Sequence, residues 1–485
     1  MKQFALNVID RLSPLATRHS PLAYADCRVV ETTTEGLLVR NGIVETIARA
    51  TDLGFGVRVL KDQAWGFSSS QDLTTQAADS VITEAIAIAQ SSASVPGSAV
   101  RLSELTPQQG SYRTKVEEDP FAVPLADKIN LLLNAEKTLR RHPDVKQGYA
   151  SMSFLRIRKV FVSTEGSVIE QELVYSGGGI WCLAIRDGDL QRRSFPAAFG
   201  GNFAQAGYEF VRAMDLAGNA DRTRDEAIML LGAEPCPDGI FDLIIDSGQL
   251  ALQVHESIGH PTELDRVLGF EESYAGKSFV TLDKFRSFRY GSNLVNVYAD
   301  STVPSGLGTF GYDDEGVPAQ RVPIIKEGIF LNYLTSRETA PVVGLTSNGT
   351  MRASGWDRIP LIRMTNINLE SGTWDFDALI ADTKQGIYVQ SNKSWSIDDR
   401  RLNFQFGTEI AWKIENGRLG EAYRNPLYTG ITPQFWNSCD AVCSAKHWQL
   451  WGLPNCGKGE PGQTAYVGHG TAPARFRKVQ VRAAG

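Results

Sequence analysis

The 485-residue sequence predicts an α+β protein of two domains. Strands and helices alternate without the regular βαβ order that a doubly wound sheet requires. Cys236–Gly239, with the sequence CPDG, is a strong break, and the residues after it are mostly strand-forming. We therefore expect an N-terminal α/β domain at residues 1–233, with a mixed sheet and long helices. A β-rich C-terminal domain is expected at residues 234–485.

The N-terminal region opens with predicted strands between residues 23 and 68, where short apolar runs are separated by glycines. Apolar residues then recur on one helical face over 72–92 and again over 125–141, which predicts two helices. The intervening segment 95–120 is rich in proline, serine, glycine and charge, and we expect a loop or linker there.

A β-meander is expected over residues 148–185, with turns at Glu165-Gly166 and at the three consecutive glycines 177–179. It is followed by one predicted helix from about 205 to 231. These elements complete the expected N-terminal domain.

In the C-terminal region, 241–245 has the composition of a buried strand, and Ser247 is placed to cap the helix that follows. Two hairpins are predicted at 326–328 and 415–417, where glycine-containing turns separate apolar runs.

Composition narrows the classes of function. Hydrophobic residues make up 42% of the chain and charged residues 21%, values typical of a soluble globular protein. A net charge of −6, without a long basic run, argues against nucleic acid as the partner. We find no apolar stretch long enough to span a membrane and no signal-peptide core around Asp10, so we expect a cytoplasmic protein.

The segment with a recognisable chemistry is His255-Glu256-Ser257-Ile258-Gly259-His260, on the predicted helix. Imidazoles bind zinc, and a catalytic zinc has three protein ligands and a water whose pKa it lowers. A neighbouring carboxylate can then take the proton of that water as general base. The sequence thus predicts zinc ligands at His255 and His260 and a catalytic base at Glu256.

The spacing is one residue longer than in the common H-E-x-x-H pattern. Side chains five positions apart on a regular α-helix point about 140° apart, against about 40° for four positions. Gly259 is conformationally permissive, and Pro261 biases His260 away from helical geometry. We therefore expect the helix to end or widen just before His260. The alternative without a metal is a capping histidine and a surface glutamate at a helix end.

The residues alone leave the third ligand open. Cys439, Cys443 and His447, at intervals of four, can form a small metal site, although such spacing more often marks one buried helix stripe. The candidates are Glu271, Glu272, Cys439, Cys443, His447 and Cys456.

Over nearly its whole length, the chain resembles the TldD/PmbA family of metallopeptidases, and TldD more closely than PmbA. The resemblance lies in the segments 255–279, 308–340, 351–354 together with 363–366, and Asn455–Lys458. It implies that His255, His260 and Cys456 bind Zn²⁺ and that Glu256 is the catalytic base. It also implies an α/β N-terminal domain and a β-rich domain that holds the metal. The implied assembly is a dimer, with itself or with a PmbA/TldE-like subunit, enclosing sites that receive unfolded or extended peptides.

Two further blocks carry charge without a settled role. Asp313–Gly316 can orient substrate or bind a second cation, or form a charged turn before a strand. Arg352 and Arg363 can hold a substrate carboxylate or form structural ion pairs.

The leading hypothesis is a peptidase that acts on unfolded chains. The alternatives are a zinc amidohydrolase acting on small substrates and a scaffold or regulatory subunit with a structural zinc.

Overall fold

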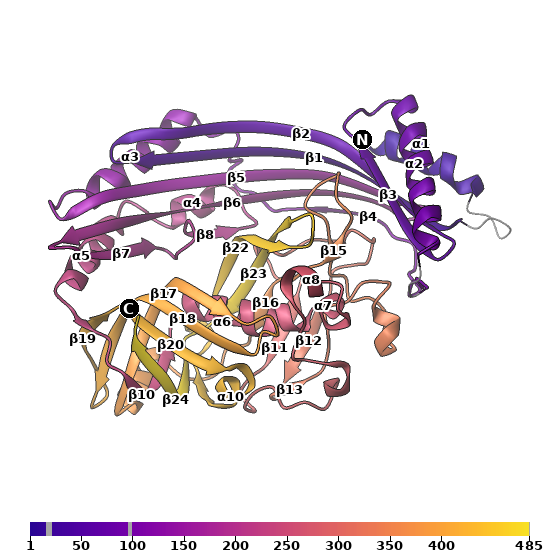
Figure 1. Cartoon of the computed structure of the whole chain (residues 1–485). Helices are drawn as coiled ribbons and strands as arrows, with labels where there is room; N and C mark the ends of the chain where they lie inside the picture. Colours follow the sequence, from indigo (N-terminus) through magenta and orange to yellow (C-terminus); the bar gives the residue numbers. More distant parts are fainter. Residues whose placement is uncertain (16–21, 96–98, 485) are drawn as a thin grey trace.

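The computed structural model describes residues 1–15, 22–95 and 99–484. A long curved sheet built from residues 22–204 lies over the rest of the chain, and a second large sheet is built from residues 234–483 (Figure 1). Helices flank both ends of the first sheet (Figure 1). The predicted α+β class is confirmed, with a strand-rich C-terminal region.

The first sheet has the order β3-β2-β1-β5-β6-β4, and β7 and β8 also pair with β6. All of its contacts are antiparallel except the parallel pairing of β4 with β6. Its strands are β1 (Leu22–Arg40), β2 (Ile43–Lys61), β3 (Ala64–Ser70), β4 (Gln109–Arg113), β5 (Val145–Ser163), β6 (Val168–Arg186), β7 (Asp189–Phe195) and β8 (Asn202–Ala204).

Helices cover the two ends of this sheet. The C-terminal half packs against the part between them. At one end the apolar sides of α1 (Lys2–Leu12) and α2 (Thr75–Ala93) pack on β1 and β2. At the other end α3 (Leu125–Leu139) and α5 (Ala220–Leu231) pack on β5 and β6. Burial of such apolar surface is the main force that holds the helices on the sheet.

Three N-terminal expectations are wrong. Residues 205–231 form two helices, α4 (Tyr208–Ala213) and α5, because Asp215 has a left-handed backbone and its carboxylate accepts from the Gly218 N–H at 3.1 Å. The segment 95–120 contains β4. The glycines 177–179 lie inside β6 instead of forming a turn.

The three glycines allow close approach of another strand. A Cβ atom at Gly177 would lie 2.1 Å from the ring of Phe203 on β8, and one at Gly179 would lie 2.6 Å from the Cα of Gly201. Real Cβ atoms do not come this close to other atoms, so only glycine fits here. The turn at Glu165-Gly166 is where it was expected, between β5 and β6.

The second large sheet has the order β17-β10-β24-β20-β18-β19-β9, with β21 paired to β24. The predicted hairpin turns at 326–328 and 415–417 are confirmed, since they join β12 to β13 and β18 to β19. The strands of this sheet are β9 (Glu234–Pro235), β10 (Gly239–Ile245), β17 (Gln385–Ile397), β18 (Asn403–Glu415), β19 (Arg418–Arg424), β20 (Pro426–Ile431), β21 (Cys439–Val442) and β24 (Ala474–Ala483).

Smaller elements complete this half around one large hydrophobic core. The sheet β13-β12-β11-β16 and the pairs β14–β15 and β22–β23 surround the helix α6. They are α6 (Ser247–Val254), α7 (Leu264–Leu268), α8 (Glu272–Ala275), β11 (Val297–Asp300), β12 (Arg321–Lys326), β13 (Ile329–Phe330), β14 (Met351–Arg352), β15 (Leu361–Ile362), β16 (Ile367–Leu369), α9 (Phe376–Asp382), α10 (Thr432–Asn437), β22 (Gln449–Lys458) and β23 (Gln463–Thr471), with 3₁₀ turns at Ser13–Leu15, Leu282–Lys284, Ala340–Val343 and Ala445–His447.

Buried charges join the two halves. Arg58 on β2 bonds to Asp26 at 2.7 Å and to Glu315 of the C-terminal half at 3.3 Å, and all three side chains are at most 3% exposed. Lys159 on β5 bonds to Asp314 at 2.6 Å. The Asp313–Gly316 block is therefore buried at the contact between the halves. The expected charged turn before a strand is present, since Asp314 and Glu315 form a turn ahead of β12.

Within the described ranges, we find no helix long and apolar enough to cross a membrane.

Candidate metal centre

The helix that carries the motif begins at a cap one residue earlier than predicted. The Asp246 carboxylate, not the Ser247 hydroxyl, accepts from the N–H groups of Gly248 and Gln249. Both distances are 3.1 Å. This satisfies two of the N–H groups that a helix leaves free at its start, and it fixes the register of the residues that follow.

Beyond α6 the helix widens into a π turn over His255–Gly259 and then continues as a 3₁₀ turn over His260–Thr262. The His260 N–H donates to the His255 carbonyl, so the two histidines are themselves the ends of the wider turn. The expected widening is present. His260 nevertheless keeps helical angles, φ −60° and ψ −41°, so Pro261 does not end the helix at this point.

Gly259 has a spatial role that the sequence did not indicate. Its backbone is ordinary helix, so its freedom of φ is not needed. A Cβ atom here would lie 2.1 Å from the sulfur of Met364, which is fully buried. The absence of a side chain therefore lets the wide turn pack against β15 and the residues after it.

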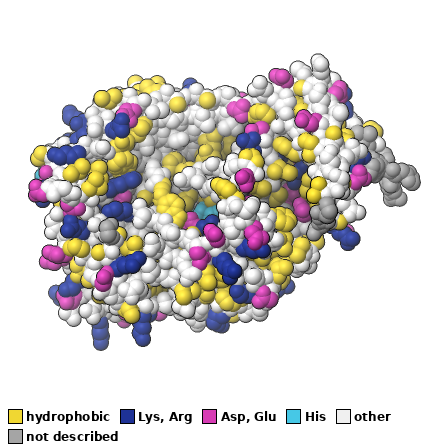
Figure 2. Space-filling model, in the orientation of Figure 1, with side chains coloured by type: hydrophobic (Ala, Val, Ile, Leu, Met, Phe, Trp, Pro, Cys, Tyr) yellow, Lys and Arg dark blue, Asp and Glu magenta, His cyan; other side chains and the backbone are white. Residues whose placement is uncertain are grey.

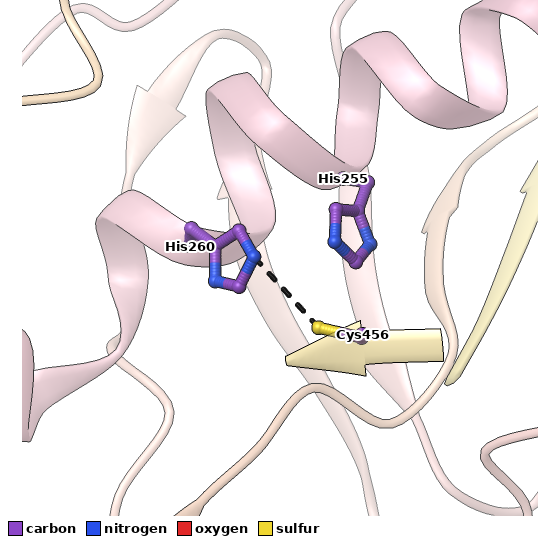
Figure 3. A group of neighbouring side chains, drawn as sticks. All are labelled: His255, His260 and Cys456. Carbon is purple, nitrogen blue, oxygen red and sulfur yellow. Dashed lines mark hydrogen bonds between the residues drawn. The ribbon is translucent and has the colours of Figure 1, made fainter. Parts of the chain in front are cut away.

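Three side chains converge from α6's extension and from β22 (Figure 3). The ligand atoms of His255, His260 and Cys456 all lie within 4.8 Å of one another, and all three residues are buried. Cys456 Sγ lies 3.8 Å from His260 Nε2. In a tetrahedral zinc site, bond lengths near 2.05 Å for nitrogen and 2.3 Å for sulfur place donor atoms about 3.3–3.6 Å apart. The set thus fits a zinc ion after small movements.

Hydrogen bonds on the far side of each imidazole leave Nε2 facing the centre. His469 Nδ1 contacts the Ile367 carbonyl at 3.2 Å, so His469 Nε2 accepts from His255 Nδ1 at 2.8 Å. His260 Nδ1 in turn donates to Glu263 at 3.0 Å. Partners of this kind orient metal-binding histidines and fix their tautomer.

The charges around the cluster favour metal-binding forms. Burial alone raises the pKa of a thiol, yet the neighbouring His260 and Arg363 hold the Cys456 pKa below its ordinary value. Burial keeps His255 neutral by lowering its pKa. By contrast, burial raises the pKa values of Cys439 and Cys443 to about 12.

Those two cysteines do not form the alternative site. Cys439 lies on β21, and His447, in a 3₁₀ turn, contacts Asp375 at 3.2 Å. Glu272 is ion-paired to Lys277, and Glu271 accepts from the Gly459 N–H. Across the described parts of the chain, the group that can hold a metal is His255, His260 and Cys456.

Glu256 contacts the β17–β18 hairpin. Its two carboxylate oxygens accept from Trp395 Nε1 at 3.0 Å and from Arg401 Nη1 at 2.8 Å. Burial opposes the charged form, but the two imidazoles, Arg401 and Trp395 together hold the Glu256 pKa below its ordinary value. The carboxylate is therefore ionised and able to accept a proton.

Sequence reasoning missed four of these neighbours: Glu263, Trp395, Arg401 and His469. Glu263 had a usable signal, because residues three apart on a helix face one another. The other three come from β17, the following loop and β23, and sequence spacing cannot place them beside a helix 139 to 214 residues away.

With the described residues, Arg352 and Arg363 form none of the expected ion pairs. Arg352 donates to the carbonyls of Met364 and Tyr466, and Arg363 donates to those of Gln463 and Cys456. Arg363 is 1% exposed and fastens the backbone of Cys456 beside the cluster.

Two adjoining cavities are lined in part by α6, the helix that leads into the centre. An apolar one is lined by Phe199, Leu252, Leu453 and their neighbours, and it shares Trp451 with a more polar cavity of about 390 Å³. Figure 2 shows the same face hollowed beneath the first sheet, with histidine visible in the hollow beside hydrophobic side chains. The edge of the Phe199 ring meets Trp395, with centroids 5.2 Å apart. Because Trp395 also donates to Glu256, one residue that lines the apolar cavity contacts a hydrogen-bond partner of Glu256.

Three sequence profiles match the chain. They describe domain 1, the central domain and the C-terminal domain of PmbA/TldA metallopeptidases, at residues 25–89, 118–231 and 238–483. The chain belongs to the PmbA/TldD metallopeptidase family. It is a TldD-like subunit, an enzyme of the metallopeptidase class.

Relatives and solved structures agree with this assignment. A metalloprotease of Methanocaldococcus jannaschii is 30% identical over 92% of this chain and 94% of its own length. A zinc metalloprotease TldD homolog of Saccharolobus solfataricus is 24% identical over 90% of this chain and 91% of its own. The crystal structure of TldE from Thermococcus kodakarensis has the same fold, with a TM-score of 0.72, 15% identity, and coverage of 99% and 100% of the two chains.

Proposed function

We propose that this TldD-like subunit is a zinc-dependent peptidase that hydrolyses unfolded or extended peptides, with Glu256 as the general base. The observation that carries the proposal is the convergence of His255, His260 and Cys456. Beside them, Glu256 is ionised and lies on the same helical turn as His255. A carboxylate in that position serves no purpose in holding a structural metal.

Each residue has a distinct task in this proposal. His255, His260 and Cys456 hold the metal through Nε2, Nε2 and Sγ. Zinc, when bound, supplies a Lewis acid that lowers the pKa of a coordinated water to near 7. Glu256 accepts the proton of the attacking water and later delivers it to the leaving amine nitrogen.

The number of ligands favours catalysis over a structural role. A structural zinc is closed by four protein ligands, whereas a catalytic one has three and an open position. The described residues offer three donors at this centre, because His469 uses Nε2 to accept from His255 and Nδ1 to reach a backbone carbonyl.

The cavities support an extended peptide over a small amide. One cavity along α6 has mainly apolar lining residues, and the adjoining one has charged residues such as Arg222 and Lys446. An extended peptide, which carries several side chains, would use both kinds of surface, whereas a small amide would not.

We further propose that the chain works as a dimer, with itself or with a TldE-like subunit, in the cytoplasm. The family and its TldE neighbour point to such an assembly. The first sheet offers a surface for it. Residues 43–53 of β2 are almost all exposed, and the β3 pairing begins only at Phe55. We also propose that residues 1–233 and 234–485 are the two domains of the subunit.

Mass spectrometry of unstructured peptides incubated with the zinc-loaded protein, alone and with a TldE-like partner, tests the function. We expect internal or terminal cleavage that a chelator abolishes and added zinc restores. Cleavage of small amides with no cleavage of peptides would favour the amidohydrolase instead. Zinc content without any hydrolysis would favour the scaffold.

A further inference from the structure

Arg401 is the arginine that contacts Glu256, and its hydrogen bonds are only partly used. Nη1 donates to Glu256, but Nε has no hydrogen-bond partner among the described residues although it is buried. Unpaired buried donors are uncommon in folded proteins, because a buried donor without a partner destabilises the fold. Such a donor next to a catalytic carboxylate indicates that a further acceptor arrives with the substrate.

The backbone around Arg401 is fixed in an unusual conformation. Arg401 has a left-handed backbone with φ +63°, which is uncommon for a residue other than glycine. Its N–H donates to the Asp398 carbonyl at 2.8 Å, and its own carbonyl accepts from the Thr432 hydroxyl at 2.9 Å. The Asp398 carboxylate caps the same loop by accepting from Leu402 and Asn403. The loop thus fixes the backbone from which the Arg401 side chain extends toward Glu256.

Other arginines near the cluster cannot reach a substrate. Arg266 and Arg363 are each 1% exposed and donate to buried carbonyl groups, those of Ala275 and of Gln463 and Cys456. The Arg401 side chain is 17% exposed, against 8% for that of Glu256, so it reaches the open side of the site.

We propose that Arg401 is a second catalytic residue, whose guanidinium donates to the scissile carbonyl oxygen as that oxygen becomes negative. This inference rests on the proposed peptidase function. In the step, the water oxygen forms a bond to the carbonyl carbon, the C=O π pair moves onto oxygen, and the water proton passes to Glu256. When the C–N bond breaks, a pair on the oxyanion re-forms the C=O bond of the new carboxyl group, and the C–N pair stays on nitrogen, which takes the proton from Glu256.

The position of Arg401 matches the movement of charge in this step. Protonation of Glu256 removes the negative charge that Arg401 faces, and the same event creates one on the carbonyl oxygen. A guanidinium that serves only Glu256 would oppose that proton transfer. A guanidinium whose Nε and Nη2 also donate to the new oxyanion has a negatively charged partner throughout the step. Donors of this kind are among the largest contributions to catalysis.

The test compares the wild type with Arg401→Ala, Arg401→Lys and the adjacent exposed control Arg400→Ala, all zinc-loaded. Loss of one oxyanion donor typically costs about 10²–10³-fold in kcat. We expect that loss for Arg401→Ala, a smaller loss for Arg401→Lys, and no change for Arg400→Ala. Zinc content and melting temperature show whether each variant is folded, and Arg401→Lys keeps the charge if the alanine variant is not.

Binding separates an oxyanion donor from a residue that merely positions Glu256. A phosphinic peptide carries a tetrahedral anion, and calorimetry should show that Arg401→Ala weakens its binding by about the same factor as it lowers kcat/KM. A reduced-amide peptide of the same sequence has no carbonyl oxygen, and its affinity should change by less than twofold. Equal weakening of both peptides, or of neither, would overturn the role of Arg401. Failure of the wild type to cleave any peptide would instead overturn the peptidase function.

Discussion

At the scale of single residues, the proposed function separates holding a metal from moving a proton. The group that can hold a metal is His255, His260 and Cys456, while the Glu256 carboxylate contacts Trp395 and Arg401. A residue that binds no metal can be removed without loss of metal, and this gives the first prediction.

Replacing Glu256 with alanine should keep zinc and the melting temperature but lower peptide cleavage by about 10²–10⁴-fold, the usual contribution of a positioned proton acceptor. His255→Ala should lose zinc and activity together. Zinc analysis, thermal unfolding and cleavage assays on both variants are the measurement. Wild-type cleavage rates in Glu256→Ala would rule out its assignment as general base.

His469 gives a second prediction, because it contacts His255 and not the metal position. His469→Gln keeps bulk and polarity but cannot reproduce the paired ring nitrogens. Loss of such partners typically weakens metal binding by about 10–100-fold. Competition with a chelator should show that loss. His447→Gln, which alters a surface histidine paired to Asp375, is the matched control and should bind zinc as the wild type does.

At the scale of elements, the π turn decides whether two histidines five positions apart can share one ion. Its fit depends on Gly259, where a methyl group would meet Met364 Sδ at 2.1 Å. Gly259→Ala should therefore displace His260 and weaken zinc binding. The double variant Gly259→Ala/Met364→Ala removes the clash and should recover most of the affinity. No recovery would mean that Gly259 acts through backbone freedom and not through space.

The same element shows how far the sequence could lead. Periodicity and turn residues predicted α2, α3, the hairpins and the widened turn, because these depend on neighbours in the chain. The resemblance, and not spacing, selected Cys456 from the candidate third ligands. The glycines of β6 and the contacts of His469 and Arg401 were not predictable, since they depend on which distant strands meet. Local signals do not encode such contacts.

At the scale of the whole molecule, buried ion pairs hold the two halves together. Arg58→Met should leave Asp26 and Glu315 buried without their cation and reduce the free energy of unfolding by about 3–5 kcal/mol. Arg11→Met breaks an exposed pair with Asp79, whose side chains are 41% and 56% exposed, and should change stability by less than about 0.5 kcal/mol. Denaturant titration of both variants is the measurement. Equal effects would show that the contact between the halves gains nothing from Arg58.

The distance along the chain between the parts of the metal centre has a consequence for the timing of synthesis. His260 precedes Cys456 by 196 residues, and β24, which pairs with β10 inside the second sheet, comes later still. At about 5–20 residues per second, a ribosome needs roughly 10–40 s to pass from one ligand to the other. During that interval the histidines and Glu256 have left the ribosome without their thiol and without the strand that closes the sheet around their helix. Under the proposed function, the nascent subunit is therefore inactive during the interval in which its own unfolded chain is the nearest substrate.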